Sequence, residues 1–197
     1  MTALQRLLRT EEPMDNLTFV GISGSLRRAS RNTGLLRCCA ANLPQGVRME
    51  IADISALPLY NEDMGKPEAA QALIRQVSAA DALVLACPEY NYSLAPALKN
   101  ALDWLSREPN LAPLNGKAAC ILGAGGGMGT SRSQLHLRQV CVYLNLRLLN
   151  KPEVFSNAFT PAFDDAGTVV DAALAGQTAE LMQELALWTR RLRAPAA

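Results

Sequence analysis

Five short apolar or β-branched runs, separated by segments with helical periodicity, constrain the fold of this chain more than any other feature. The runs occupy residues 17–23, 47–53, 82–88, 118–123 and 146–149. A helical pattern fills each gap between them, and another follows the last run. Strands that alternate with helices form right-handed crossovers and a parallel sheet with helices on both faces. The sequence therefore predicts an α/β chain built from βα units.

The spacing of apolar residues within two of these runs indicates their places in the sheet. Residues 47–51 alternate apolar and charged side chains, whereas residues 82–87 are apolar throughout. An alternating strand suits the edge of a parallel sheet, and a wholly apolar strand suits its centre. This distribution favours the flavodoxin-like strand order 2-1-3-4-5, and no further run supports a six-stranded dinucleotide-binding order. We therefore predict a doubly wound, five-stranded parallel sheet with helices on both faces.

Length and composition are typical of a single domain that has neither a nucleic-acid nor a membrane partner. The 197 residues include 19 basic and 18 acidic side chains, so net charge attracts the chain to neither surface. We expect a loose extension over residues 1–16, one domain over residues 17–192 and a tail over residues 193–197. The first residues carry acids and lack a long apolar stretch, which argues against a secretory signal. Five cysteines without paired spacing indicate reduced core thiols, and we expect a cytoplasmic protein.

The turn after the first apolar run has the composition of a phosphate-binding turn. Residues 17–23 lead into a segment rich in Gly, Ser, Arg and Asn that opens a helix. Backbone N–H groups at a helix N-terminus carry partial positive charge and bind anions. The side chains that add donors or positive charge here are Ser25, Arg27, Arg28, Ser30, Arg31, Asn32 and Thr33. This segment alone leaves an alternative open, which is an ordinary turn with Ser30 as N-cap and solvated arginines.

Two further loops of unusual composition follow the third and fourth apolar runs. Residues 87–93 offer a rigid proline, two tyrosines and an amide, which together can flank a flat heteroaromatic ring. Residues 123–129 are rich in glycine, so bare backbone can approach a ligand and donate N–H bonds. In a doubly wound sheet, ligands bind beyond the carboxyl ends of the strands where the strand order reverses. We therefore expect all three loops to meet at one crevice.

Other binding and catalytic motifs are incomplete in this sequence. The glycine run does not match the dinucleotide-binding pattern in any register, and the lysine of a P-loop is absent. Residues 21–25 fall one residue short of a hydrolase nucleophile elbow, and the sole histidine, His136, lies within a helical pattern. One histidine and no spaced cysteine pair predict no metal site. A hydrolase is therefore a distant alternative.

Three ordered segments together resemble a known family. They are residues 24–32 (GSLRRASRN), residues 88–93 (PEYNYS) with residues 98–106 (LKNALDWLS), and residues 131–139 (SRSQLHLRQ). They resemble the NADPH-dependent FMN reductase family, which includes quinone and chromate reductases, and the likeness spans about residues 17–192. The resemblance implies a flavodoxin-like fold, non-covalently bound FMN, NAD(P)H as co-substrate, and a homodimer or homotetramer. The acceptors that it implies are quinones, free flavins, azo compounds and metal oxyanions such as chromate.

The resemblance also implies a set of cofactor-binding residues. For the FMN phosphate it implies Ser25, Arg27, Ser30 and Asn32, to which the turn adds Thr33. For the isoalloxazine ring it implies Pro88, Glu89, Tyr90 and Asn91. For the pyrimidine edge of the ring it implies backbone N–H groups of Gly123, Gly125, Gly126 and Gly127, although relatives often carry serines where Gly123 and Ala124 stand. Subunit contacts are implied for Arg132 and Glu153, with Leu135 in place of a tyrosine.

The chemistry that the resemblance implies resides in the cofactor. We expect ping-pong transfer of hydride from NAD(P)H to the flavin and then to the acceptor, with no side chain as acid, base or nucleophile. The alternative is a flavodoxin-type electron carrier or flavin-binding module without NAD(P)H turnover. Flavodoxins usually dock through a strongly acidic surface, and the balanced charge of this chain argues against that alternative.

Overall fold

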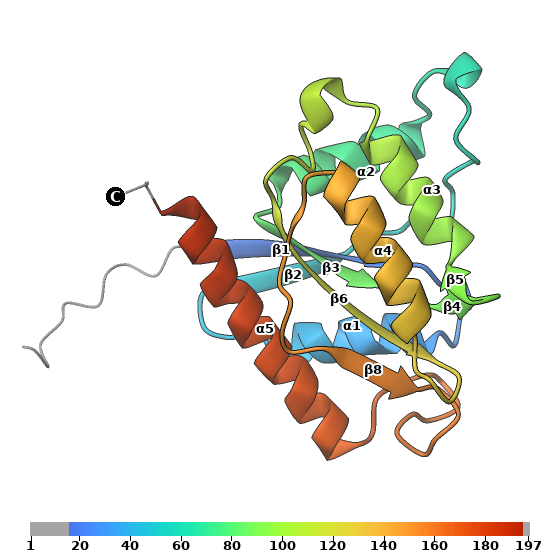
Figure 1. Cartoon of the computed structure of the whole chain (residues 1–197), viewed down its shortest axis with the longest axis vertical. Helices are drawn as coiled ribbons and strands as arrows, with labels where there is room; N and C mark the ends of the chain where they lie inside the picture. The colour runs from blue at the N-terminus through green and yellow to red at the C-terminus, as the bar shows by residue number, and fades with distance from the viewer. Residues whose placement is uncertain (1–15, 195–197) are drawn as a thin grey trace, which may run out of the picture.

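The computed structural model describes residues 16–194, and a parallel β-sheet runs through them (Figure 1). The strands of this sheet are β1 (Leu17–Ser23), β2 (Val47–Ile51), β3 (Ala82–Ala86), β6 (Ala118–Gly125), β7 (Arg147–Leu148) and β8 (Val154–Asn157). A separate antiparallel hairpin consists of β4 (Glu89–Tyr90) and β5 (Ser93–Leu94). Most of the expected extension over residues 1–16 and of the tail over residues 193–197 lies outside the described residues.

The strand order confirms the predicted topology. The strands follow the order β2-β1-β3-β6, and β7 and β8 both pair in parallel with β6. The fifth position of the sheet is therefore filled by two segments in succession, β7 opposite the start of β6 and β8 opposite its end. Because β6 lies at the fourth position, this is the predicted order 2-1-3-4-5.

The fifth strand differs from its prediction in position and length. The run at residues 146–149 forms only the short β7, and residues 154–157, which belong to none of the five predicted runs, form β8. Pro152 lies between them and has no N–H to donate to a ladder, so the pairing is interrupted there. In β8 the side chains of Val154 and Ser156 are buried while Phe155 is exposed, which is the alternation of a half-buried strand.

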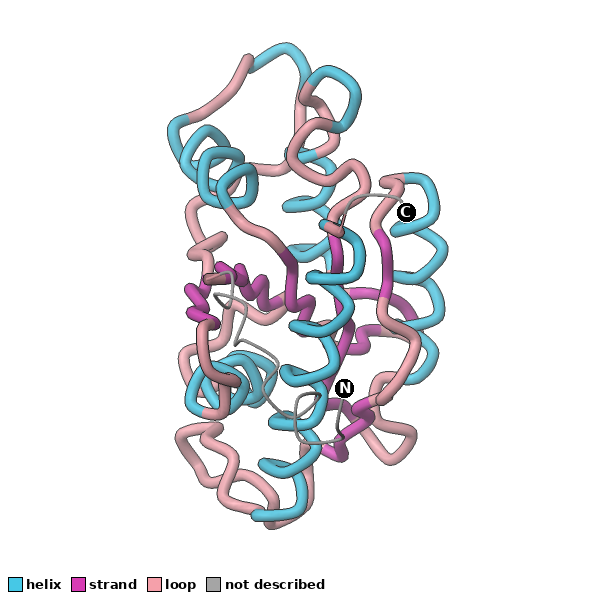
Figure 2. The backbone as a smooth tube through the Cα atoms, turned by 90° about the vertical axis from the view of Figure 1, so that its left-hand side faces the viewer, coloured by secondary structure: helices cyan, strands magenta, loops and turns pink. Residues whose placement is uncertain are grey.

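Helices cover both faces of the sheet. They are α1 (Arg31–Ala41), α2 (Glu68–Ala79), α3 (Pro96–Leu105), α4 (Ser131–Tyr143) and α5 (Ala172–Arg193), with two short 3-10 turns, η2 (Glu62–Met64) and η3 (Pro109–Leu111). One hydrophobic cluster joins Val20 and Leu83 to α2, α3 and α4, and the other joins Phe19 and Val84 to α1 and α5. Figure 1 shows these two groups of helices on opposite sides of the strands, and the turned view in Figure 2 keeps the strands between them.

The cysteines and the helices of the described residues each have a further property that bears on function. All five cysteines are unpaired thiols, and Cys39, Cys87, Cys120 and Cys141 are buried in the core. Within residues 16–194, no helix combines the length and the apolar character that crossing a bilayer requires.

Candidate functional site

A pocket of about 180 Å³ lies beyond the carboxyl ends of β1, β3 and β6. The loop after β1 contributes Ser25, Arg27, Ser30 and Asn32 to its lining. The loop after β3 contributes Pro88, Glu89 and Tyr90. The loop after β6 contributes Gly125 and Gly126. The three loops that the sequence predicts to meet therefore share one pocket, while four further predicted residues do not line it: Thr33, Asn91, Gly123 and Gly127.

The three loops pack closely against one another at two glycines. A Cβ added to Gly24 would lie 2.8 Å from Cδ of Pro88, so only glycine lets the first loop pack on the second. A Cβ added to Gly123 would lie 2.5 Å from the carbonyl oxygen of Cys87, so the end of β6 is pressed against the second loop. Gly123 thus contributes to the shape of the site even though it does not line the pocket.

The start of α1 has the features of an anion-binding site. Ser30 is the N-cap, a feature of the alternative that the sequence left open, and its Oγ accepts a hydrogen bond from the Thr33 N–H at 3.1 Å. Arg31 and Asn32 occupy the first helical turn, where backbone N–H groups have no partner in the preceding turn. Arg27 and Arg31 line the pocket, and neither forms an ion pair with any acidic side chain of residues 16–194. Positive charge therefore remains available to a ligand at this end.

Two of the predicted phosphate ligands have partners within the protein. The buried side-chain amide of Asn32 donates to the Ala124 carbonyl at 2.9 Å and accepts from the Ala124 N–H at 3.0 Å. One amide hydrogen of Asn32 is therefore left for a ligand. The hydroxyl of Thr33 donates to Oγ of Ser23 at 2.9 Å, and Thr33 lines a neighbouring pocket instead.

The second loop forms the β4–β5 hairpin, which the sequence analysis does not predict. Its two central residues, Asn91 and Tyr92, have φ values of 51° and 64°. Positive φ at both positions is the signature of a type I′ turn, in which asparagine is common and tyrosine is not. Arg132 stabilises this turn, since its Cζ lies 3.8 Å from the centroid of the Tyr92 ring.

Glu89 fixes the hairpin to the start of α4. Its carboxylate, only 6% exposed, forms an ion pair with Arg132 and accepts a hydrogen bond from Nε of that residue at 2.6 Å. It also accepts from the backbone N–H groups of Arg132 and Ser133 at 3.2 Å and 3.3 Å. The helix N-cap, Thr130, makes no side-chain capping bond, so Glu89 caps α4 from a distant part of the chain. The carboxylate raises the pKa of the Arg132 guanidinium above its ordinary value.

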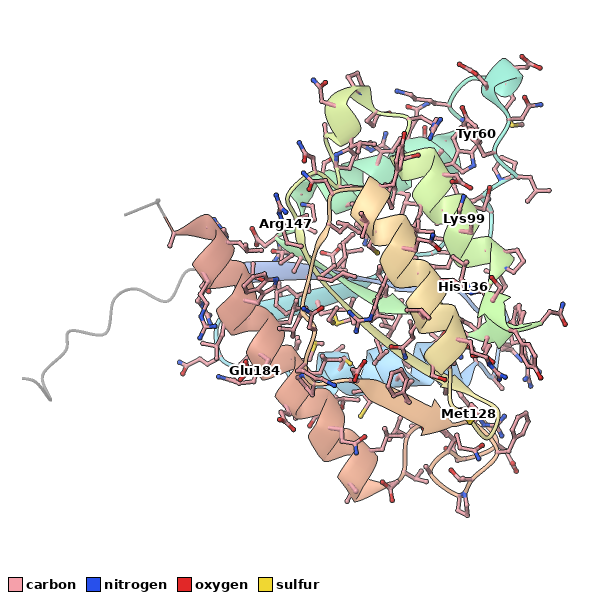
Figure 3. The ribbon with its side chains drawn as sticks, in the orientation of Figure 1. Tyr60, Lys99, Met128, His136, Arg147 and Glu184 are labelled. Atoms are coloured by element: carbon pink, nitrogen blue, oxygen red, sulfur yellow. The ribbon has the colours of Figure 1, made fainter. Side chains whose placement is uncertain are left out.

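A third contact joins the same hairpin and helix. Oγ of Ser93 lies 3.0 Å from Nδ1 of His136, and Figure 3 shows His136 on α4. The sole histidine thus contacts a serine of the hairpin. Arg132 and Glu153, for which subunit contacts were expected, both have partners within the chain, Glu89 for the first and Arg138 and Lys151 for the second.

The third loop is a tight turn at the end of β6. The Gly129 N–H donates to the Gly126 carbonyl at 2.8 Å, and Gly129 has a φ of 60°. Met128 is exposed, and Figure 3 shows it at the end of the molecule that carries the β4–β5 hairpin. A Cβ on Gly125 would collide with the Gly129 carbonyl, whereas a Cβ on Gly126 would meet nothing within 4 Å. Gly126 therefore presents bare backbone to the pocket.

The structure adds residues that the sequence analysis did not assign to the site. Ala158 and Phe159 follow β8 and line the pocket, as does Ala124, while Arg31, whose charge was expected in the first loop, lines it too. The Ala158 N–H donates to the Gly125 carbonyl at 2.7 Å, which joins this segment to the third loop. The only signal for Phe159 was a large apolar residue in a stretch without periodicity, and its side chain is 80% exposed.

The chemical groups of the site suit the binding of a ligand. Burial raises the pKa of the Cys87 thiol to about 11, so this thiol beside the second loop is protonated at neutral pH. The side chains of residues 16–194 bring together no group of three or more His, Cys, Asp and Glu that could hold a metal ion. The site offers an anion-binding end, aromatic and proline walls, and bare backbone, which suits a flat ligand with an anionic tail.

Comparison with known proteins identifies the family. Residues 17–161 match the family of NADPH-dependent FMN reductases. The chain belongs to this family. An NAD(P)H-dependent FMN reductase of Pseudomonas aeruginosa is 48% identical over 183 residues, which are 91% of this chain and 98% of that protein. A probable NADPH:quinone oxidoreductase of Oryza sativa subsp. japonica is 45% identical over 188 residues, which are 90% and 94% of the two chains.

A solved structure agrees with this assignment. The flavoenzyme NAD(P)H:acceptor oxidoreductase FerB of Paracoccus denitrificans has a TM-score of 0.80 to this reductase at 26% identity. The match covers 89% of this chain and 98% of that one. As a family member, the chain is an oxidoreductase whose cofactor is FMN and whose co-substrate is NAD(P)H.

Two observations within the pocket test whether its residues fit FMN. At the anion-binding end of the pocket, Nε of the lining residue Arg31 is buried and has no hydrogen-bond partner within the described residues. At the other end, Gly126 leaves backbone uncovered in the lining. An orphaned guanidinium donor suits a phosphate, and uncovered backbone suits the polar edge of a flavin ring. The residues present therefore fit the cofactor of the family.

Proposed function

We propose that this reductase transfers electrons from NAD(P)H to quinones through FMN held in the pocket at the carboxyl end of the sheet. The observation that carries the proposal is the convergence of three loops, each suited to a different part of FMN, on one pocket. The name of the rice relative, a probable NADPH:quinone oxidoreductase, supports quinones as acceptors.

We assign the FMN phosphate to the first loop. Ser25, Arg27 and Ser30 line the pocket where the first N–H groups of α1 are open, and Asn32 keeps one amide hydrogen for the ligand. Hydrogen bonds between these donors and a phosphate are charge-assisted and therefore strong. Thr33 is assigned a supporting role, because its hydroxyl bonds Ser23 within the same turn.

We assign the isoalloxazine ring to the second and third loops. Pro88 and Tyr90 supply flat walls, Glu89 fixes them on α4, and Asn91 lies at the turn of the same hairpin. Gly125 and Gly126, the two predicted glycines that line the pocket, bring backbone N–H groups to the pyrimidine edge, and Gly123 shapes the loop behind them. Donors at that edge stabilise negative charge that develops on the ring during reduction.

The pocket leaves one side of a flat ligand open. Its volume of about 180 Å³ lies below the roughly 300–1,000 Å³ of pockets that enclose a whole ligand. FMN, when bound, supplies the two-electron chemistry, accepting hydride from NAD(P)H and passing it to the acceptor. The exposed rings of Tyr90 and Phe159 border the opening and provide apolar surface for a flat substrate. Nicotinamide and acceptor would use this opening in turn, which gives ping-pong kinetics.

The same opening would admit several classes of acceptor. Quinones, free flavins and azo compounds are flat, and chromate is small, so an open-sided pocket suits each of them. We further propose a cytoplasmic homodimer or homotetramer. Exposed apolar side chains at Leu135, Val142 and Tyr143 of α4 support self-association.

An anaerobic titration tests the proposed function. The purified protein should be yellow, NAD(P)H should bleach it, and a quinone should restore the colour in equal amount. A protein that binds FMN tightly but is never bleached would instead be an electron carrier.

A steady-state comparison of NADH with NADPH over quinones, flavins, azo dyes and chromate then defines the acceptors. Double-reciprocal plots of initial rate against NAD(P)H concentration, at several fixed acceptor concentrations, should give parallel lines if the order is ping-pong.

A further inference from the structure

Arg31 has an unusual environment for an arginine. It is the first residue of α1, directly after the N-cap Ser30, and it lines the pocket. Its Nε is fully buried and has no hydrogen-bond partner within residues 16–194. A buried donor without an acceptor is unfavourable, because the group has lost its water and gained nothing in exchange. A ligand that supplies an acceptor would remove this cost.

Other arginines of the described chain do not share this combination. Arg132 and Arg193 have carboxylate partners, Glu89 and Asp81, and Arg27 is exposed to water. Arg190 also has a buried nitrogen without a partner, but it lies on α5 and does not line the pocket. Among the described arginines, Arg31 therefore combines a place in the pocket lining with a buried nitrogen that has no partner.

The packing around α1 brings the segment after β8 close to the start of the helix. A Cβ on Gly34 would collide with the Gly167 carbonyl, and a Cβ on Gly167 would lie 2.9 Å from the Ala29 carbonyl. The segment after β8 is thus pressed against the start of α1, and Phe159 from this segment lines the same pocket as Arg31.

No acidic group in the pocket is free to neutralise Arg31. Glu89 is the acidic residue of the lining, and its two carboxylate oxygens are already used by Arg132 and the start of α4. Arg27 adds a second unpaired positive charge to the same lining. Two positive charges without a counter-charge favour a ligand that carries about two negative charges.

We propose that Arg31 is a second cationic ligand, beside Arg27, for a phosphate monoester bound at the start of α1. Nε and the neighbouring Nη of a guanidinium form a fork that matches two phosphate oxygens. The identity of the ester rests on the proposed function. It is the 5′-phosphate of FMN, and the other source of the same chemistry is the 2′-phosphate of NADPH.

Substitution of Arg31 tests this role through ratios of affinities. Dissociation constants of FMN and of riboflavin, which lacks the phosphate, are measured on the flavin-free protein for wild type, Arg31→Met and Arg31→Lys. We expect Arg31→Met to weaken FMN binding about tenfold to hundredfold and to leave riboflavin binding unchanged. Arg31→Lys should restore part of the loss, because it keeps the charge but not the fork. The control is Arg37→Gln, which removes an exposed charge of the same helix outside the pocket and should leave the ratio unchanged.

The outcomes separate the two phosphates and separate this role from the proposed function. A loss confined to FMN affinity supports the flavin phosphate. Unchanged FMN affinity with a selective fall in kcat/KM for NADPH against NADH supports the 2′-phosphate. If the ratio of FMN to riboflavin affinity and the ratio of kcat/KM for NADPH to that for NADH both match wild type, Arg31 is not a phosphate ligand. A fraction of unfolded variant affects both members of each ratio equally and therefore cancels. If wild type itself fails to bind FMN, the proposed function fails, and inorganic phosphate then tests Arg31 alone. Phosphate should raise the melting temperature of wild type and Arg37→Gln more than that of Arg31→Met, and equal shifts would overturn the role.

Discussion

The side-chain amide of Asn32 holds the backbone of Ala124, 92 positions further along the chain, by two hydrogen bonds. Nδ2 donates to the Ala124 carbonyl at 2.9 Å, and Oδ1 accepts from the Ala124 N–H at 3.0 Å. Asn32 lies in the first turn of α1 and Ala124 lies near the end of β6, so this one residue joins the phosphate-binding turn to the glycine-rich loop. The geometry of the pocket therefore depends on Asn32 before any ligand is present.

Replacement of Asn32 with Ala should destabilise the protein in the absence of flavin. We expect the free energy of unfolding to fall by about 2–4 kcal/mol, because two hydrogen bonds are lost and both backbone groups of Ala124 are left without partners. Urea unfolding of the flavin-free protein measures the change. Asn150→Ala, at an exposed position, is the control and should change stability by less than about 0.5 kcal/mol. Wild-type stability combined with weak FMN binding would mean that Asn32 acts on the ligand alone.

Replacement of Glu89 with Gln tests the capping of α4. The change removes the charge that Arg132 pairs with and weakens the acceptor for two helix N–H groups, so stability should fall by about 1–3 kcal/mol. FMN affinity should fall as well, because the hairpin that carries Tyr90 is no longer fixed on α4. Asp103→Asn breaks a more exposed ion pair with Lys99 and should cost about 0.5 kcal/mol or less in the same urea titration. Equal losses from the two substitutions would contradict a capping role.

Two neighbouring glycines should respond differently to the same substitution. Gly126→Ala adds a methyl group that meets no protein atom within 4 Å, so stability should change by less than about 0.5 kcal/mol. FMN affinity should nevertheless fall at least about tenfold, because the methyl group occupies the approach of the ring to the backbone. Gly125→Ala forces a collision with the Gly129 carbonyl and should destabilise the flavin-free protein itself. Thermal melting and FMN titration of both variants give the comparison, and normal FMN binding by Gly126→Ala would exclude the third loop from the ring site.

The sequence was sufficient to predict the features that depend on local pattern. Strands β1, β2, β3 and β6 were recognised from their apolar runs, and the alternation in β2 against the wholly apolar β3 gave the strand order. The order then predicted that the loops after β1, β3 and β6 meet, and they share one pocket. Ser30 could be named as an N-cap, within the alternative of an ordinary turn, because capping depends on residues within one turn of the helix.

Features that depend on contacts between distant residues could not be predicted in this way. Asn32 has the composition of a phosphate ligand, but nothing local indicates that its amide bonds Ala124. Glu89 likewise caps a helix that begins more than forty residues later. Strand β8 has only four residues, one of them a serine, which is too short for a periodic pattern, and Phe159 reaches the pocket because β8 places it there.

The buried thiol of Cys87 should make stability decrease at alkaline pH. Burial raises the pKa of this thiol to about 11 from an ordinary value of 9.0, and a hydrogen bond with Ser133 offsets part of the rise. Between these values the unfolded chain has released the thiol proton while the folded protein still holds it, so unfolding is favoured as pH rises. The contribution of Cys87 is complete below pH 9 and is lost as pH approaches 11, by up to about 1.4 kcal/mol for each pH unit. Urea unfolding of wild type and Cys87→Ala at pH 7, 9, 10 and 11 under reducing conditions isolates this residue, since the other thiols are common to both proteins. The stability advantage of wild type should shrink over the upper three pH values, and a constant advantage from pH 7 to 11 would show that Cys87 does not hold its proton more tightly in the folded state.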